Sequence, residues 1–376
     1  MQDRYERALK ALNTRNRLRV LTPQLGIDFS SNDYLGLSTS TELSDAILEA
    51  LERGVPIGAG GSRLLRGNKP EHECLEAEAA GFFGAESCLF MGGGFAANTA
   101  IFSCLPQRGD LILYDELIHA SSREGIKMGN AEGISVLHNN LDAFETNILK
   151  WRKKGHKGQV WIALETIYSM EGDTAPLESF NNLAQRYDAM LVLDEAHATG
   201  IFGPKGQGLG HTLEGLPHVI SLHTCGKALG VMGALILAPR HFRDFLINRA
   251  KPFIYATAPS PLIAAAVRVA LKIVSEKKEL RTALFERIKH FRKEFKNRCN
   301  LIGTETQIQP IILKSNTRAL LISKNLQKLG FDVRAIRPPT VPEGSARLRV
   351  SLTLNATSED ITSLIREFEK QQRGVF

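Results

Sequence analysis

The chain has 376 residues, enough for a large and a small domain, and its 43% hydrophobic and 23% charged residues are near globular averages. No apolar run approaches the roughly 20 residues that cross a bilayer, and residues 1–7 lead into no apolar signal segment, so we expect a cytoplasmic protein without membrane association. The net charge of +7 is concentrated mainly in a helical pattern at 277–298 that also contains glutamates, which favours a solvated helix face over a nucleic-acid site, although a mild positive excess also suits anionic small substrates.

Five cysteines are scattered along the chain without a CxxC pair, which argues against a disulfide framework and a zinc site: Cys74, Cys88, Cys104, Cys225 and Cys299. We expect reduced thiols.

Helical spacing and short apolar runs alternate through the first two-thirds of the chain. The spacing predicts helices at 42–53, 71–83, 180–187 and 261–275, and the apolar runs predict strands at 111–114, 160–164, 190–193, 219–222 and 234–237. This alternation indicates an α/β domain with a mostly buried sheet.

The pattern changes after about residue 259. Long helices follow, with strand candidates at 309–313 and 347–352 and a closing helix at 358–371. We therefore expect an N-terminal segment at 1–35, a large domain at 36–259 and a smaller α+β domain at 260–376.

Three glycines at 92–94 precede small residues that begin a helical pattern. The backbone N–H groups of such a turn can hold a phosphate, although the segment is neither a GxGxxG nor a Walker motif, and a simple flexible turn is the alternative interpretation. Thr224 and Thr257 can donate hydroxyl groups to the same anion, and both also suit ordinary turns.

The run MLVLD at 190–194 ends on a carboxylate, and His197 follows three residues later. Carboxyl ends of strands are where α/β folds place their sites, and an acid there can keep a pyridinium nitrogen protonated. His197 can meet the phenolic oxygen of such a ring or a substrate carbonyl. A capped turn and a metal pair remain alternatives, but no third metal ligand has suitable spacing.

Lys227 follows an apolar strand and has small residues on both sides. A lysine that is partly desolvated can act as a nucleophile near neutral pH, which suits a cofactor-binding lysine. Taken alone, the segment fits an ordinary strand-to-loop junction better.

The order of these motifs resembles the α-oxoamine synthases, which are pyridoxal-phosphate enzymes of fold type I. The resemblance covers residues 29–371 and rests on FSSNDYLGL at 29–37, GAGGSRLLRGN at 58–68, SMEGDTAPL at 169–177, LDEAHATGIFG at 193–203 and TCGKALG at 224–230. It implies an α/β fold with a mostly parallel central sheet and a homodimer with shared sites. Arg63 and Arg66 in the second motif can meet anionic groups, and surface charge accounts for them equally well.

The resemblance also implies roles around pyridoxal 5'-phosphate, with no metal. Lys227 would bind the cofactor covalently and later move protons, and Asp194 would pair with the pyridine nitrogen. His119 would stack on the ring, while Ser169 and His197 would lie near its phenolic oxygen.

Further residues follow from the same resemblance. Gly94, Phe95 and Thr224 would hold the cofactor's phosphate, and Thr257 would reach the phosphate of the neighbouring subunit. Asn32 would face the reaction centre, and Arg349 would bind the amino-acid carboxylate.

Four activities compete within this family. The segment AIRPPTVP at 335–342 resembles the member that serves biotin biosynthesis, which implies L-alanine and a pimeloyl thioester, carried by coenzyme A or by a carrier protein. The alternatives are glycine C-acetyltransferase, 5-aminolevulinate synthase and the long-chain serine acyltransferases. A non-catalytic partner subunit is a different class, and it would be expected to lack the lysine.

Overall fold

The computed structural model describes residues 2–295 and 304–373, and Cys299 and the end of the basic stretch at 277–298 lie outside them. The chain divides into two compact units. One unit comprises residues 35–169 and 174–281, and the other comprises residues 1–34, 170–173 and 282–376. Each unit is described by itself.

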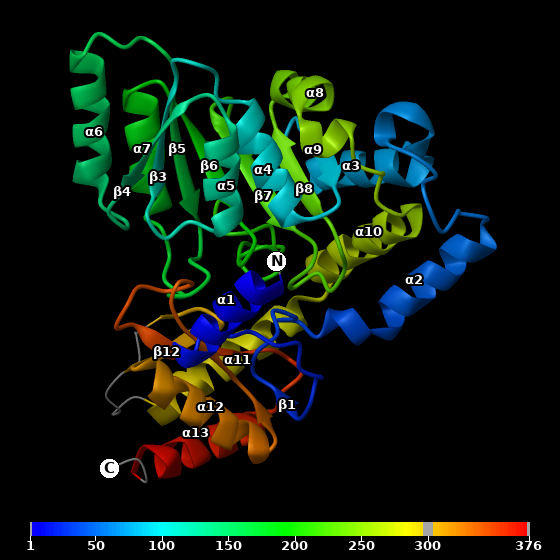
Figure 1. Ribbon diagram of the computed structural model, residues 1–376. Coiled ribbons are helices and arrows are strands. Elements are labelled where there is room, and N and C mark those ends of the chain that lie inside the picture. Colours follow the sequence, from blue (N-terminus) through cyan, green and yellow to red (C-terminus); the bar gives the residue numbers. More distant parts are fainter. Residues whose placement is uncertain (1, 296–303, 374–376) are drawn as a thin grey trace. The chain divides into compact units, whose positions relative to one another are not determined.

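The first unit, which we call the large unit, is built on an extended sheet. Within the described residues, seven strands pair in the order β2-β8-β7-β6-β5-β3-β4 (Figure 1). They are β2 (Ser87–Met91), β3 (Leu111–Asp115), β4 (Glu132–Val136), β5 (Val160–Glu165), β6 (Ala189–Asp194), β7 (Val219–Thr224) and β8 (Ala234–Ala238). Strands β4, β3, β5, β6 and β7 pair in parallel, whereas β8 runs antiparallel to both β7 and β2. The expected α/β fold with a mostly parallel sheet is confirmed.

The large unit also contains the following helices. They are α2 (Thr41–Glu52), α3 (Pro70–Phe83), α4 (Gly94–Cys104), α5 (Ala120–Met128), α6 (Leu141–Lys153), α7 (Leu177–Arg186), α8 (Arg240–Arg249), α9 (Lys251–Ile254) and α10 (Pro261–Glu276), with short turns η1 (Leu37–Thr39) and η2 (Arg63–Gly67). The side chains of Ser40 and Asn140 accept the N–H groups of Leu43 and Ala143 at the starts of α2 and α6. Helix α10, which follows residue 259, packs on α2 and α3 inside this unit.

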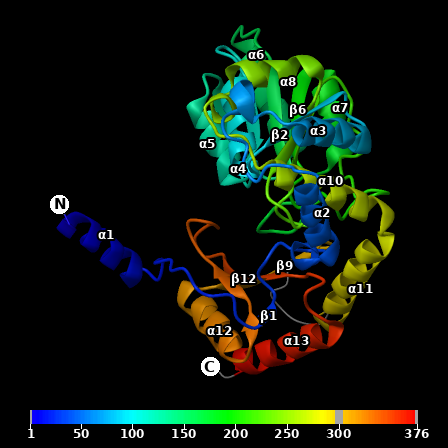
Figure 2. The same ribbon diagram turned by 90° about the vertical axis from the view of Figure 1, so that its right-hand side faces the viewer.

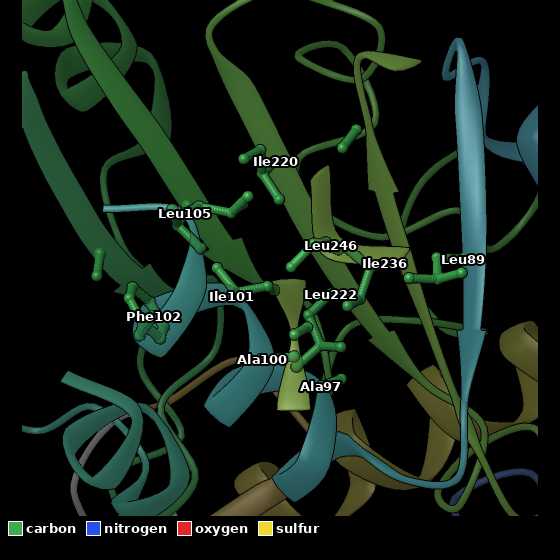
Figure 3. Packing of buried hydrophobic residues seen from close by; sticks show 14 of the residues in the cluster. Leu89, Ala97, Ala100, Ile101, Phe102, Leu105, Ile220, Leu222, Ile236 and Leu246 are labelled. Carbon is green, nitrogen blue, oxygen red and sulfur yellow. The ribbon is translucent and has the colours of Figure 1, made fainter. Parts of the chain in front are cut away.

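Two apolar clusters fill the two faces of the sheet. On one face, Ile101 and Phe102 of α4 and Leu246 of α8 pack against Leu222 and Ile236 of the sheet (Figure 3). On the other face, α6 and α7 pack against the alternate residues of β3, β5 and β6. Because β5 and β6 are buried along their whole length, they read as continuous apolar runs, and the predicted strands there are confirmed.

The second unit, the small unit, contains a three-stranded antiparallel sheet in the order β11-β12-β9 among its described residues. Helix α12 lies against this sheet and α13 against α12 (Figure 2). Its elements are α1 (Gln2–Thr14), β1 (Ile27–Asp28), β9 (Ile308–Lys314), α12 (Asn316–Lys328), β10 (Phe331–Asp332), β11 (Arg334–Ile336), β12 (Ala346–Ser351) and α13 (Ser358–Arg373), and α11 (Lys278–Phe295) begins in the large unit. The predicted strands at 309–313 and 347–352 and the closing helix are confirmed.

Across 2–295 and 304–373, no helix is long and apolar enough to cross a membrane.

Candidate active site

Polar residues gather at the carboxyl edge of the large sheet. Strands β3, β5, β6 and β7 run parallel and end at Asp115, Glu165, Asp194 and Thr224. Parallel strands bring their carboxyl ends to one edge, so these four residues share it. Lys227 follows directly after β7, in the link to β8.

The amine of Lys227 lies 2.9 Å from Nε2 of His197. His197 is buried, and Lys227 is half-buried in the link between β7 and β8. Backbone hydrogen bonds within this link hold its two ends together. The N–H of Cys225 donates to Gly233, and the N–H of Val231 donates to Cys225, each at 2.9 Å. The structure therefore brings together two of the residues selected from the sequence.

Asp194 is 8% exposed at the end of β6 and has two hydrogen-bond donors. The N–H of Ala196 donates to Oδ1 at 3.0 Å, and Nδ2 of Asn98 donates to Oδ2 at 2.8 Å. Both carboxylate oxygens of Asp194 are therefore held by hydrogen-bond donors in a buried position.

Asn98 also links Asp194 to His119. Its Nδ2 lies 3.0 Å from Oγ of Ser121, and that oxygen lies 2.7 Å from Nδ1 of His119. His119 is the N-cap of α5, where its Nδ1 also accepts the N–H of Ser121 at 3.3 Å. Asn98 and Ser121 do not stand out in the sequence, because a small polar residue in a helical run gives no distinguishing signal.

The surroundings of His119 favour its uncharged ring. Loss of hydration lowers the pKa of His119, and the nearby cations of Lys227 and Arg123 lower it further, whereas the Asp194 carboxylate opposes them. The imidazole nevertheless keeps an exposed surface that is available for a ligand.

The glycine turn adjoins Thr224. A Cβ added to Gly94 would lie 2.6 Å from Cγ2 of Thr224, which only glycine avoids. Gly94 begins α4, whose first N–H groups have no partners within the helix, so the turn and Thr224 together form a cradle for an anion. Phe95 is 57% exposed beside it.

Two other selected residues differ in their placement. Ser169 is half-buried, and its N–H donates to Oε2 of Glu165 at 3.0 Å, at the same edge of the sheet. Thr257 lies exposed after α9, and within the described residues no hydrogen bond joins it to the cluster around Lys227.

Glu195, next to Asp194, is a buried acid that the sequence did not single out. It is fully buried and accepts the hydroxyl of Thr166 and the N–H of Leu209, each at 3.0 Å, as well as the N–H of Gly210. Burial raises the pKa of the Glu195 carboxyl to about 7, although His223 and the Gly210 N–H oppose that rise. Glu195 thus ties the glycine-rich segment at 203–210 to the strand that carries Asp194.

Arg349 and Asn32 come together in the small unit. Nη2 of Arg349 donates to Oδ1 of Asn32 at 3.1 Å, and Nη1 donates to Oγ of Ser351 at 2.7 Å. The hydroxyl of Tyr34 donates to the same Asn32 oxygen at 2.9 Å, and burial raises the pKa of Tyr34. Hydrogen bonds to Asn32 and Ser351 thus hold Arg349 in place, with 6% of its surface exposed.

Arg63 forms a buried ion pair with Glu76. Its guanidinium forms two hydrogen bonds with the Glu76 carboxylate, at 2.9 and 3.0 Å, and both side chains are buried. It is neither a surface charge nor a free anion-binding group. Among the described residues, no group of three or more His, Cys, Asp or Glu side chains is arranged to hold a metal ion.

Comparison with known proteins gives consistent similarities. The family model of aminotransferase class I and II matches residues 25–368. The 8-amino-7-oxononanoate synthase of Acidithiobacillus ferrooxidans is 38% identical, over 90% of this chain and 86% of that one.

Two solved structures have the same fold. A serine palmitoyltransferase of Sphingomonas wittichii is 25% identical, with a TM-score of 0.89 over 98% of this chain and 96% of that one. The 8-amino-7-oxononanoate synthase of Francisella tularensis is 27% identical, with a TM-score of 0.77 over 93% of this chain and 98% of that one.

Proposed function

The chain belongs to the aminotransferase class I and II family, and from that membership we propose that it condenses L-alanine with a pimeloyl thioester. The products are 8-amino-7-oxononanoate, carbon dioxide and the free thiol, which is a step of biotin biosynthesis. The observation that carries this proposal is the Lys227 amine 2.9 Å from His197, at the sheet edge where Asp194 ends β6. Relatives 38% identical and a solved structure 27% identical bear the name of this synthase and support it.

The residues of the large unit fit pyridoxal 5'-phosphate. The α4 turn at Gly94 and Phe95, with Thr224, suits its phosphate, and the buried Asp194 carboxylate suits its pyridine nitrogen. When bound, this cofactor supplies an electron-withdrawing ring that stabilises negative charge on the α-carbon of the amino acid.

The cofactor contacts divide among the remaining residues. Lys227 would hold the cofactor covalently, and His119 would stack on its ring. Ser169 and His197 would lie near the phenolic oxygen, and Thr257 would reach the phosphate bound by the neighbouring subunit of a homodimer.

Lys227 and His197 also suit the proton transfers of the reaction. Once the amino group of alanine has replaced Lys227 on the cofactor, the freed, uncharged amine would take the α-proton of alanine and later return a proton to the product. His197, 2.9 Å from the amine, can exchange a hydrogen bond with it between these two transfers. By the family resemblance, Asn32 and Arg349 would bind the carboxylate of alanine, for which a guanidinium is well suited.

A long-chain serine acyltransferase is the second candidate. The serine palmitoyltransferase structure has a TM-score of 0.89, against 0.77 for the synthase structure. The two solved structures share the same fold, so the similarity of this chain's backbone to each of them does not decide between their substrates. Residues 335–342 and the name of the 38% identical relative favour the pimeloyl thioester.

A competition experiment tests the substrate. The purified protein receives pyridoxal phosphate, equal alanine, glycine and serine, and equal acetyl, succinyl, palmitoyl and pimeloyl coenzyme A, and the products are identified by mass spectrometry. We expect 8-amino-7-oxononanoate to dominate. A different aminoketone as the main product would refute the choice of substrate.

The control is Lys227→Ala, which should form no aminoketone with any pair of substrates. If the unaltered protein forms none with coenzyme A thioesters, the same competition is run with pimeloyl carrier protein. Failure with both carriers would refute the proposed activity.

A further inference from the structure

A chain of hydrogen bonds runs from Asp194 through Asn98 and Ser121 to His119. The three contacts are 2.8 Å from Asn98 to Asp194, 3.0 Å from Asn98 to Ser121, and 2.7 Å from Ser121 to His119. Asn98 and Ser121 are 2% and 0% exposed, so water does not compete for these bonds. Oδ1 of Asn98 is buried without a hydrogen-bond partner in the described part of the chain.

The donors in this chain have only one consistent assignment. An ionised carboxylate only accepts, so the Asn98 amide must turn its nitrogen toward Asp194, which leaves Oδ1 unsatisfied. That nitrogen also donates to Oγ of Ser121, so the Ser121 hydroxyl is free to donate its own hydrogen to Nδ1 of His119. The backbone N–H of Ser121 can only donate, and it points at the same Nδ1 at 3.3 Å.

The two donors therefore share the one lone pair of His119 Nδ1, which carries no proton. From this we infer that Asn98 and Ser121 are positioning residues, which hold His119 as the uncharged tautomer with its proton on Nε2 and link it to Asp194. The inference rests on the proposed function, in which His119 stacks on the cofactor ring.

The benefit of this arrangement is electrostatic. Asp194 would keep the cofactor's ring nitrogen protonated, and a ring with that positive charge is repelled by an imidazolium but not by a neutral imidazole. The charged groups that act on His119 are Asp194, Lys227 and Arg123, and the two cations also oppose a charged ring. The buried Asn98 oxygen is left without a partner so that the amide can donate in both directions.

Nitrogen NMR of the full chain labelled at histidine tests the inference, with and without pyridoxal phosphate. His119→Gln identifies the signals of His119 among the 10 histidines. We expect the Nε2–H tautomer in the cofactor-free protein. The Nδ1–H tautomer would overturn the inference without any variant being needed.

Three serine variants test the donor to Nδ1. Ser121→Ala removes one hydrogen bond to the neutral ring, so the pKa of His119 should rise by about half to one unit. Ser121→Thr keeps a hydroxyl and should restore the lower pKa. Ser122→Ala is the matched control, because Ser122 is a buried neighbour that takes no part in this chain of hydrogen bonds. It should leave the pKa of His119 unchanged. Equal titration of His119 in all three variants would refute the role of Ser121.

Asn98→Ala tests the direction of the chain. Without the Asn98 donor, the Ser121 hydroxyl can turn its hydrogen away from His119 and accept from Nδ1–H instead, so a fraction of the Nδ1–H tautomer should appear. An unchanged tautomer would remove Asn98 from the inference. Because these signals come from cofactor-free protein, their outcome is separate from that of the product competition, which alone decides the proposed function.

Discussion

At the scale of single residues, the site depends on where charge is placed. Asp194 is a buried carboxylate with two donors, and its neighbour Glu195 faces the other side of the strand, toward Thr166 and Gly210. The two adjacent acids therefore have different surroundings. Substitution of Asp194 should affect the reaction, whereas substitution of Glu195 should affect the stability of the fold.

Removal of the Asp194 charge should slow the removal of the α-proton of alanine and leave the fold intact. Asp194→Asn keeps the size of the side chain but no longer favours a protonated ring nitrogen, so we expect proton removal from alanine to slow by about 100-fold or more. The measurement is exchange of the alanine α-hydrogen in deuterated water, followed by NMR with cofactor and without thioester. Asp142→Asn, on the exposed first turn of α6, is the control. Normal exchange in Asp194→Asn would contradict the assigned role.

Glu195 should make the fold less stable as the pH rises. Its pKa is about 7 in the folded chain, above its usual value of 4.5, so the folded state holds a proton that the unfolded state has lost between those two values. Its contribution to the free energy of unfolding is therefore complete below pH 4.5 and falls by about 3 kcal/mol as the pH rises through 7.

Glu195→Gln removes this titration. The difference in melting temperature between the unaltered protein and Glu195→Gln should favour the unaltered protein at pH 5 and shift toward the variant by pH 8. A difference that stays constant over this range would show that Glu195 does not titrate there.

At the scale of elements, the start of α4 and the end of β7 approach each other closely. Gly94→Ala would place a methyl group 2.6 Å from Thr224, so the helix or the threonine must move. Such overpacking costs about 1–3 kcal/mol, and we expect pyridoxal phosphate to bind about 10-fold more weakly or worse. Equilibrium dialysis measures this affinity. Gly92→Ala is the matched control, because a Cβ there meets nothing within 4 Å. Equal affinities of the two variants would argue against the cradle.

The elements that the sequence predicted are those with strong periodicity. Strands β5, β6 and β7 are buried runs, and α10 has a long apolar face, so their patterns were clear. Strands β2 and β4 were missed: β4 is short, largely exposed, and contains glycine and serine, and β2 has only three strongly apolar residues after Ser87 and Cys88. The hydrogen bonds of Asn98 depend on α4 and α5 meeting in space, which no local pattern indicates.

The candidate site also contains residues that local sequence patterns predict and residues that depend on the fold. Lys227, Asp194 and His197 lie within distinctive motifs, and sequence order alone was enough to select them. Ser121 and Glu195 act through contacts with residues that are distant in the chain or on another element, so only the fold identifies them.

At the scale of the whole molecule, the proposal requires two copies of the chain. Thr257 is exposed and has no hydrogen bond to the Lys227 cluster of its own chain in the described residues, which suits a residue that serves a neighbouring subunit. Each site would then take Lys227 from one subunit and Thr257 from the other.

Mixed dimers test this arrangement. Lys227→Ala and Thr257→Ala proteins should each have low activity, and unfolding and refolding them together should produce mixed dimers with one intact site. Random pairing predicts about a quarter of the unaltered activity. The activity is measured as product formed per subunit, and light scattering checks that the mixture is dimeric. No gain on mixing would place Thr257 and Lys227 in the same subunit's site or show that Thr257 is not needed.

The antiparallel direction of β8 has a further consequence for Lys227. A parallel successor to β7 would need a long crossover, whereas β8 lets the chain turn back at once, and the link at 225–233 is closed by its own hydrogen bonds. The lysine thus has an immobile base and a flexible four-carbon arm. The amide hydrogens of Cys225 and Val231 should exchange slowly with solvent, while the Lys227 amine moves on the timescale of a side-chain rotation.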